Sequence, residues 1–252
     1  MKKTALITGA SAGLGVEFAH QLAAAGYDLV LVARRKEKLD TVADELRQRH
    51  GCDVHTLSAD LSEPGAPAAI EAAIERPIDY LVNNAGSAGP NLLEDRDWPE
   101  QDAFLRLMMI SVAEMCHRFV PPMVERGFGR VINVSSFAGR VVRSAGANYG
   151  PSKAYLISLS EELALMTHGS GVHVSALCPG FTHTDFHAAG DLQEMKDGLP
   201  SWLWYDADVV VREGIEAVER GKAVAISGRL YRVLDPLARS PLAKGLIKRT
   251  SR

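Results

Sequence analysis

The sequence has few cysteines, little net charge and no long apolar run, and each shortage excludes a class of protein. Its cysteines are Cys52, Cys116 and Cys178, an odd number without a Cys-x-x-Cys pair, which argues against a disulfide framework or a zinc knuckle. A net charge of -3 gives no general reason to bind nucleic acid. No apolar stretch approaches the roughly 20 residues that span a bilayer. We therefore expect a cytoplasmic protein with a small-molecule ligand and no nucleic-acid partner.

The sequence is rich in short runs of Val, Ile and Leu that alternate with longer amphipathic stretches. Hydrophobic residues make up 46% of the 252 residues, an ordinary value for one globular domain. Apolar runs separated by helical patterns predict strands buried on both faces of a parallel sheet. We predict strands at 4–8, 29–33, 54–58, 80–83, 131–135, 172–178 and 223–227, and helices at 13–26, 36–50, 66–76, 97–126, 147–168 and 207–220. This alternation predicts an α/β fold with a doubly wound parallel sheet and helices on both faces.

A long connection at 181–206 falls outside the alternation, and connections of this length are usually functional, so we predict a substrate lid there. Trp202 and Trp204 could cap an apolar substrate or pack the lid on itself. His183 and His187 are four positions apart, but no third ligand stands out. We therefore expect a polar pocket wall and no metal.

The tail at 229–252 is basic, with Asp235 as its single acidic residue. A basic amphipathic helix could lie on a membrane surface. Pro236, Pro241 and Gly245 interrupt such a helix, so we do not expect membrane binding, with weak peripheral contact as the open alternative. Packing against the substrate cleft or a neighbouring subunit is the other interpretation.

The turn after the first predicted strand is rich in glycine: residues 8–15 are Thr-Gly-Ala-Ser-Ala-Gly-Leu-Gly. Glycines let the backbone turn tightly and approach a pyrophosphate, whose charge the N–H groups at a helix N-terminus favour. A glycine cluster alone is a weak signal, and the strand–turn–helix context strengthens it. The predicted dinucleotide contacts here are Gly9, Ser11, Gly13, Leu14 and Gly15.

The end of the second predicted strand indicates which dinucleotide binds. An acidic residue near this place would bind the free ribose 2′-hydroxyl of NAD, whereas an arginine accommodates the 2′-phosphate of NADP. Ala33 supplies no carboxylate, and Arg34 and Arg35 follow it. The arginines could also be merely solvated at a helix start. We expect NADP(H) to be preferred, with NAD(H) as the alternative.

Further motifs follow in order after the glycine-rich turn: Asp60-Leu61, Asn83-Asn84-Ala85-Gly86, Ser136, Tyr149-x-x-x-Lys153 and Pro179-Gly180. Together they resemble the short-chain dehydrogenase/reductase family over nearly the whole chain. The resemblance implies a single Rossmann-type domain over residues 1–252, a nicotinamide cofactor, and hydride transfer between an alcohol and a ketone or aldehyde. It also implies Asp60 near the adenine and Thr184 near the nicotinamide carboxamide. The cofactor contacts it implies are Asp60, Leu61, Asn83, Ala85, Gly86, Tyr149, Lys153, Pro179, Gly180, Thr182 and Thr184.

The predicted catalytic residues are Ser136, Tyr149 and Lys153. Carbonyl reduction places negative charge on oxygen, so a positioned donor must supply a proton. A nearby ammonium favours the phenolate of Tyr149, and Lys153 at i+4 lies on the same helical face. Ser136 would hold the substrate oxygen; it is preferred to Ser135 because its separation from Tyr149 matches the family. Pro151 is tolerated only in a first turn, so the helix should begin near Tyr149.

The sequence departs from the family in the long helix at 97–126, which commonly contains an asparagine that helps a water reach the lysine. No asparagine occurs between Asn91 and Asn133; Met108 takes the place without gaps, and Ser111 lies one turn further on. Ser111 or a backbone carbonyl could hold the water, or catalysis could be slow. A cofactor-sensing binding protein without turnover is therefore the alternative function.

The family resemblance also implies an oligomer, a homodimer or a homotetramer. In the family, the paired long helices at 97–126 and 147–168 form the subunit contact. Apolar residues such as Leu105, Met109 and Val112 allow such a contact, and burial within one subunit explains them equally well.

Overall fold

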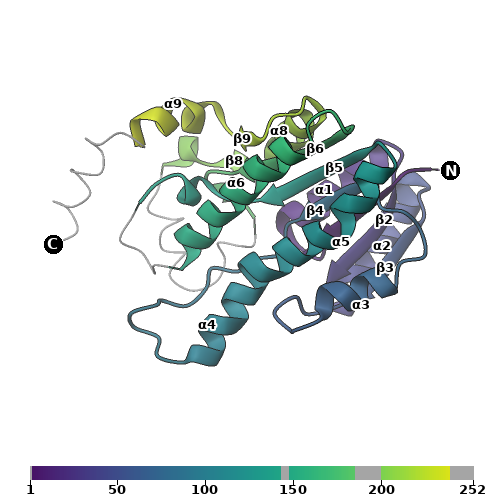
Figure 1. The fold of residues 1–252 in the computed structure, drawn as a ribbon, viewed down its shortest axis with the longest axis horizontal. Helices are drawn as coiled ribbons and strands as arrows, with labels where there is room; N and C mark the ends of the chain where they lie inside the picture. The colour runs from purple at the N-terminus through teal and green to yellow at the C-terminus, as the bar shows by residue number, and fades with distance from the viewer. Residues whose placement is uncertain (1, 143–147, 185–199, 239–252) are drawn as a thin grey trace.

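A computed structural model describes residues 2–142, 148–184 and 200–238, and a seven-stranded parallel sheet forms its centre (Figure 1). The strand order is β3-β2-β1-β4-β5-β6-β9. Their bounds are β1 Thr4–Thr8, β2 Asp28–Ala33, β3 Val54–Ser58, β4 Tyr80–Asn83, β5 Gly129–Val134, β6 Val172–Cys178 and β9 Val224–Ile226. The predicted doubly wound α/β fold is confirmed.

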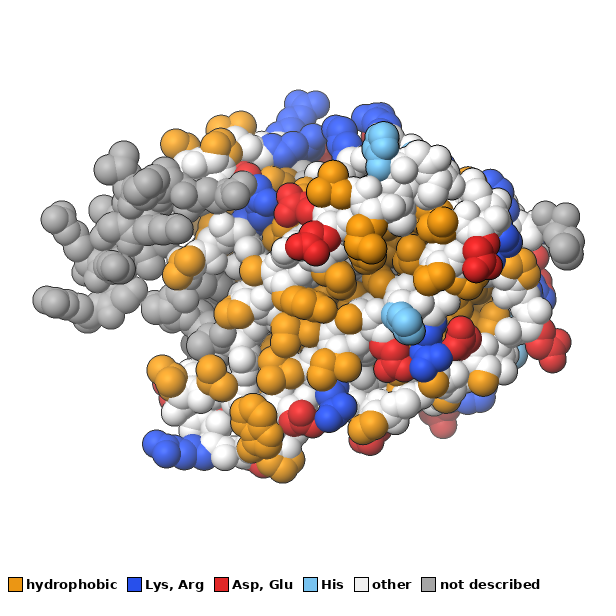
Figure 2. Space-filling view, viewed as in Figure 1, with side chains coloured by type: hydrophobic (Ala, Val, Ile, Leu, Met, Phe, Trp, Pro, Cys, Tyr) orange, Lys and Arg blue, Asp and Glu red, His pale blue; other side chains and the backbone are white. Residues whose placement is uncertain are grey.

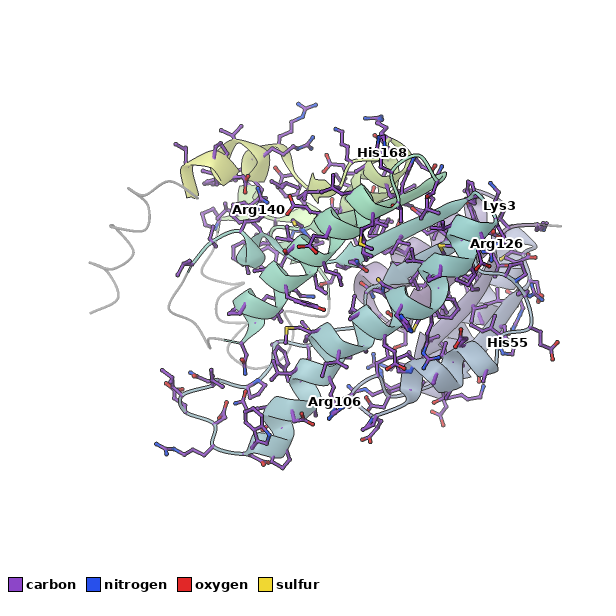
Figure 3. All side chains as sticks on the ribbon, in the orientation of Figure 1. Lys3, His55, Arg106, Arg126, Arg140 and His168 are labelled. Atoms are coloured by element: carbon purple, nitrogen blue, oxygen red, sulfur yellow. The ribbon has the colours of Figure 1, made fainter. Side chains whose placement is uncertain are left out.

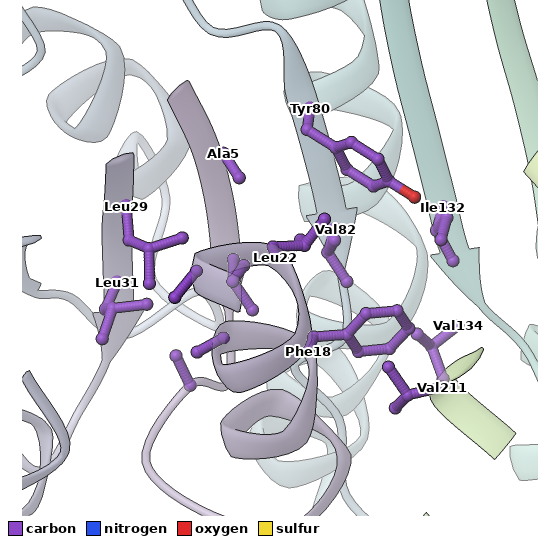
Figure 4. Packing of buried hydrophobic residues seen from close by; sticks show 14 of the residues in the cluster. Ala5, Phe18, Leu22, Leu29, Leu31, Tyr80, Val82, Ile132, Val134 and Val211 are labelled. Carbon is purple, nitrogen blue, oxygen red and sulfur yellow. The ribbon is translucent and has the colours of Figure 1, made fainter. Parts of the chain in front are cut away.

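Helices cover both faces of the sheet. On one face α1 (Gly13–Ala24), α2 (Lys36–His50) and α8 (Ala207–Glu219) bury apolar side chains against the strands, among them Phe18, Leu22 and Val211 (Figure 4). On the other face, α3 (Ala66–Ala72), α5 (Ser111–Glu125) and α6 (Tyr149–Met166) do the same. Because both faces are covered, the central strands are apolar runs without alternation.

The predicted long helix at 97–126 consists of three pieces. α4 (Trp98–Leu105) leads into a single π-helical turn, η1 (Arg106–Ile110), and α5 continues from Ser111. In this turn the Ser111 amide donates to the Arg106 carbonyl, five residues back. π-helical turns of this kind are frequent at functional sites.

The region after residue 181 contains structure that the sequence pattern did not predict. β7 (Thr182–His183) pairs with β8 (Tyr205–Asp206), the 3₁₀ turn η4 (Ser201–Leu203) precedes β8, and α9 spans Arg229–Ala238. The expectation that Pro236 interrupts a helix is wrong, because α9 runs across it. Residues 185–199 of the predicted lid, His187 among them, and residues 239–252 of the tail lie outside the described residues.

The topology fixes where a ligand can bind. The chain runs from β1 outward to β3 and then returns to β4 on the other side of β1. Crossover connections therefore diverge between β1 and β4, and a crevice forms at the carboxyl ends of the strands. Within the described residues, no helix combines the length and apolar character needed to cross a membrane.

Candidate active site

A cleft of about 1000 Å³ opens at the carboxyl ends of the strands. It brings together seventeen of the nineteen predicted site residues from segments far apart in the sequence. These are Gly9, Ser11, Gly13, Leu14, Arg34, Arg35, Asp60, Leu61, Ala85, Gly86, Ser136, Tyr149, Lys153, Pro179, Gly180, Thr182 and Thr184. Gly15 and Asn83 are the two that do not line it.

Both of these residues lie next to the cleft, in its supporting structure. A Cβ on Gly15 would lie 2.2 Å from the Gly9 carbonyl oxygen, so only glycine lets α1 pack this closely on the turn. The Asn83 side chain is buried and donates to Asn133 Oδ1 at 2.9 Å. Its neighbour Asn84, which the sequence reading did not select, donates to the carbonyls of Thr8 at 3.0 Å and Gly9 at 3.3 Å.

The glycine-rich turn fits a pyrophosphate. Gly9 has a φ of 66°, and a Cβ there would lie 2.9 Å from the Ala85 Cα. α1 begins at Gly13, its N-cap Ala12 supplies no capping hydrogen bond, and its first turn contains no acid. The helix N-terminus therefore offers backbone N–H groups to an anion. Thr184, after β7, lies 3.3 Å from where a Gly13 Cβ would be.

Two exposed arginines border the cleft beside this turn. Arg34 Nη1 lies 3.6 Å from Asp60 Oδ2, and Arg35 Nη2 donates to Ser11 Oγ at 3.3 Å. Burial raises the pKa of Asp60, but hydrogen bonds from Ser62 and the nearby Arg34 outweigh burial and lower it. Ala33 leaves the end of β2 without a carboxylate, so these residues fit a cofactor with an additional phosphate.

Tyr149 and Lys153 share one face at the start of α6, and both line the cleft. α6 begins at Tyr149, which confirms that Pro151 lies in its first turn. Lys153 Nζ donates to the Val134 carbonyl at 2.9 Å and lies 5.7 Å from the centre of the Tyr149 ring. Burial lowers the pKa of Lys153 to about 8. The Lys153 amine therefore lies beside the Tyr149 ring within the lining of the cleft.

The two adjacent serines differ in what their hydroxyls do. Ser135 is buried and donates to the Lys153 carbonyl at 2.7 Å, which ties β5 to α6. Ser136 Oγ accepts from the Ala138 amide at 3.1 Å, at the start of the 3₁₀ turn η2 (Phe137–Gly139). A hydroxyl that accepts one bond still has its proton to donate. Ser136 can therefore bind a substrate oxygen from the cleft wall.

The π-helical turn η1 brings Met108 to the position next to the lysine. A Cβ on Gly86 would lie 3.3 Å from Met108 Sδ and 3.7 Å from Lys153 Nζ. The thioether and the amine therefore both lie next to the Gly86 backbone. Ser111 is buried and donates to the Leu107 carbonyl at 2.8 Å. The serine hydroxyl therefore uses its proton within its own helix.

The described residues at the two ends of the predicted lid pack against one another. Trp204 is buried, with its ring 5.1 Å from that of Phe181 and 5.4 Å from that of His183. Trp202 is exposed. In the described part of the chain, no three His, Cys, Asp or Glu side chains are grouped so that they could hold a metal.

Several large side chains that were not among the predicted site residues also line the cleft: Leu107, Phe137, Phe181 and, from α9, Tyr231. The position of Tyr231 places the first part of the basic tail against the cleft, one of the two interpretations left open. The signal in the sequence is weak, because Tyr231 lies in no motif and the nearby Pro236 argues against a helix.

Known proteins with similar sequences and structures agree with this geometry. Residues 3–194 match the family model described as short chain dehydrogenase. The chain is 34% identical over 240 residues to the 3-oxoacyl-(acyl-carrier-protein) reductase of Staphylococcus aureus, covering 92% of this chain and 97% of that relative.

Two solved structures are similar along almost the entire chain. A short-chain dehydrogenase from Sphingobium yanoikuyae in complex with NADPH has a TM-score of 0.83 at 31% identity, covering 98% of this chain and 95% of that one. The bulky-bulky ketone specific alcohol dehydrogenase from Comamonas testosteroni has a TM-score of 0.78 at 26% identity, covering 98% and 94%.

The fold and the cleft define a dinucleotide-binding oxidoreductase. The chain belongs to the short-chain dehydrogenase family, as its motifs predicted. It is an oxidoreductase with a nicotinamide cofactor that acts on CH–OH or C=O groups.

Proposed function

We propose that this protein is an NADP(H)-preferring oxidoreductase that interconverts an apolar ketone and its secondary alcohol. The observation that carries the proposal is the arrangement around Lys153. Its buried amine is held by the Val134 carbonyl at 2.9 Å and lies beside the Tyr149 ring, in the lining of the cleft.

When bound, the nicotinamide supplies or accepts the hydride. The chain's own residues handle the oxygen and the proton. Ser136 donates a hydrogen bond to the substrate oxygen, and Tyr149 gives that oxygen a proton during reduction or takes one during oxidation. The Lys153 charge favours the phenolate that Tyr149 becomes after giving its proton. Negative charge that develops in the cleft thus meets a fixed donor and a fixed cation.

Arg34 and Arg35 support NADP(H) over NAD(H), because both are exposed and border the cleft next to the glycine-rich turn. Arg34→Ala removes a cation that can pair with the 2′-phosphate, so we expect the Kd for NADPH to rise about tenfold or more. The Kd for NADH should change by less than about twofold. Fluorescence titration measures both. The matched control is Arg49→Ala, because Arg49 is an exposed arginine elsewhere on α2. If Arg34→Ala weakened NADPH and NADH binding equally, Arg34 would not recognise the 2′-phosphate.

The substrate end of the cleft supports an apolar substrate. Among the described residues, its lining includes Pro90, Leu107, Phe137, Val141 and Phe181. The charged residues in the described lining are Arg34, Arg35, Asp60 and Lys153, which belong to the predicted cofactor and proton-transfer positions. The name of the Comamonas testosteroni relative specifies bulky ketones, and a lining of this kind suits such molecules.

Turnover of ketones with NADPH, and of alcohols with NADP⁺, tests the reaction. We expect Tyr149→Phe to lower kcat by about 100-fold or more while NADPH still binds, because general acid–base catalysis is lost. Tyr155→Phe is the matched control, since Tyr155 is on the same helix but does not line the cleft. NADPH binding without turnover of any carbonyl or alcohol by the wild type would instead favour a cofactor-sensing protein.

The proposed function also implies a domain organisation, a cellular location and an assembly. We infer one catalytic domain over residues 1–252, with the substrate lid at about 181–206. We also infer that the enzyme works in the reducing cytoplasm. All three cysteines are free and buried, which supports this location. A homodimer or homotetramer is the expected assembly.

A further inference from the structure

Tyr231 lies at the junction of the catalytic loops and α9. Its side chain is buried, and its ring is 5.0 Å from that of Phe137, the residue after Ser136. A Cβ on Gly180 would lie 1.9 Å from the Tyr231 ring, so the ring rests directly on the Gly180 backbone. The tyrosine ring therefore forms a fixed part of the cleft wall next to the Ser136 segment.

The Tyr231 hydroxyl has both of its roles filled by backbone groups. It accepts from the Phe181 amide at 3.1 Å and donates to the Leu203 carbonyl at 2.9 Å. Phe181 and Leu203 belong to the two ends of the predicted lid. Because the proton of this hydroxyl is already donated, and burial raises its pKa, Tyr231 is not an acid for the reaction.

A buried ion pair holds α9 in this position. Arg140, which follows η2 and is labelled in Figure 3, caps that turn. Its guanidinium donates to both carboxylate oxygens of Asp235 at 2.7 and 2.6 Å. The two side chains are only 11% and 12% exposed. Bidentate arginine–carboxylate pairs fix orientation as well as distance. α9 is thereby joined to the loop that contains Ser136, and the Tyr231 ring cannot retreat without breaking this pair.

From these contacts we propose that Tyr231 is a specificity-determining residue that limits the size of the substrate group lying beyond the carbonyl. The inference rests on the proposed function, since it names the wall of that same site. The ring is rigid, it is held at its hydroxyl from both sides, and it faces a lining of apolar side chains. Ketones whose substituent reaches this wall are rejected by overlap with the ring, and smaller ones are accepted.

The test is a series of alkyl phenyl ketones in which the alkyl group grows from methyl to butyl. We measure kcat/KM with NADPH, and separately the Kd of each ketone for the NADP⁺-bound protein by calorimetry. In Tyr231→Ala, the butyl-to-methyl ratio of kcat/KM and of affinity should rise about tenfold over the wild type. In Tyr231→Phe, which keeps the ring, the ratio should stay within about twofold, while KM rises for every ketone because both ends of the lid lose their bond.

Tyr205→Ala is the matched control. The Tyr205 hydroxyl accepts from the Leu230 amide at 3.3 Å, so its loss loosens the start of α9, but the residue does not line the cleft. Its butyl-to-methyl ratio should equal that of the wild type. An equal shift in Tyr205→Ala would overturn the inference, because displacement of α9 would then explain the selectivity. NADPH binding checks that each variant is folded, and Tyr231→Leu replaces Tyr231→Ala if the latter does not bind it.

The two proposals fail in different ways. If the wild type turns over no ketone or alcohol, the proposed function fails, and the calorimetric ratio still tests Tyr231. If the wild type is active but Tyr231→Ala leaves the ratio unchanged, the Tyr231 inference fails alone. An absence of ketone binding by either protein overturns the inference as well.

Discussion

At the residue scale, Lys153 is an ionisable side chain that is almost completely buried. It is 5% exposed, and burial lowers its pKa from 10.5 to about 8. Between these two values the native state binds fewer protons than the unfolded state, so stability rises with pH across this window. Below pH 8 the amine is charged in both states, and its burial costs about 3 kcal/mol.

Replacing this lysine by an apolar residue should make the protein more stable and less active. Without cofactor at pH 7, we expect Lys153→Met to raise the free energy of unfolding by roughly 2 kcal/mol and the Tm by about 4–8 °C. The gain should shrink from pH 8 upward and vanish near pH 10.5, as the wild-type amine becomes neutral in both states. Turnover should fall about 100-fold or more. Lys222→Met, at an exposed position, is the control. If Lys153→Met were less stable than the wild type at pH 7, the hydrogen bond to the Val134 carbonyl would contribute more free energy than burial of the charge costs.

Ser111 gives a second prediction at this scale. Its hydroxyl donates to the Leu107 carbonyl, and it was one of two residues that the sequence offered for the missing family asparagine. Because that proton is already used, Ser111→Ala should leave kcat within about twofold, with the same pH profile. Stopped-flow measurement of NADPH oxidation over pH 6 to 10 checks this. A tenfold loss would restore Ser111 to the proton path.

Motif order selected residues that the structure brings to one cleft, but it did not predict where each side chain points. Asn83 and Asn84 are adjacent at the end of β4, where successive side chains point to opposite sides. Asn83 points into the core, toward Asn133, whereas Asn84 supports the glycine-rich turn. A linear motif does not contain this distinction, because it depends on which face of the sheet each side chain meets.

At the scale of elements, apolar runs predicted the seven strands of the sheet because those strands are buried on both faces. The π-helical turn η1 escaped prediction, since one residue more per turn barely changes the apolar pattern over a single turn. α9 escaped for another reason. Its stabilising contact pairs Asp235 with Arg140, which is 95 positions earlier, and no local pattern records such a contact.

The Arg140–Asp235 pair should therefore determine the stability of α9. Asp235→Asn leaves the Arg140 guanidinium buried without its counter-charge, so we expect a loss of about 3–5 kcal/mol in the free energy of unfolding, or local release of α9. Urea unfolding measures the first, and amide hydrogen exchange of residues 229–238 measures the second. Arg220→Met breaks an exposed pair with Glu216 and should cost less than about 1 kcal/mol. If Asp235→Asn changes neither quantity, α9 is held by its apolar contacts alone.

At the scale of the whole molecule, α5 and α6 present an apolar face to the solvent. Figure 2 shows apolar side chains gathered over these two helices, in the orientation of Figure 1. Leu165 is 76% exposed and Met166 79%, with Ile110 and Tyr155 also exposed. Large contiguous apolar patches are uncommon on monomers and mark interaction surfaces. This surface agrees with the expected homodimer or homotetramer.

A single charge on this face tests the assembly. For the wild type we expect light scattering after size exclusion to give two or four times the 27.2 kDa of one chain. Leu165→Glu would place a carboxylate in an apolar contact, where an unpaired charge costs several kcal/mol, so its mass should fall toward that of one chain at micromolar concentration. Leu93→Glu is the matched control, because Leu93 is 80% exposed in the loop before α4 and should not change the mass. A wild type at 27.2 kDa would contradict the assembly, and a Leu165→Glu variant of unchanged mass would place the contact away from the end of α6.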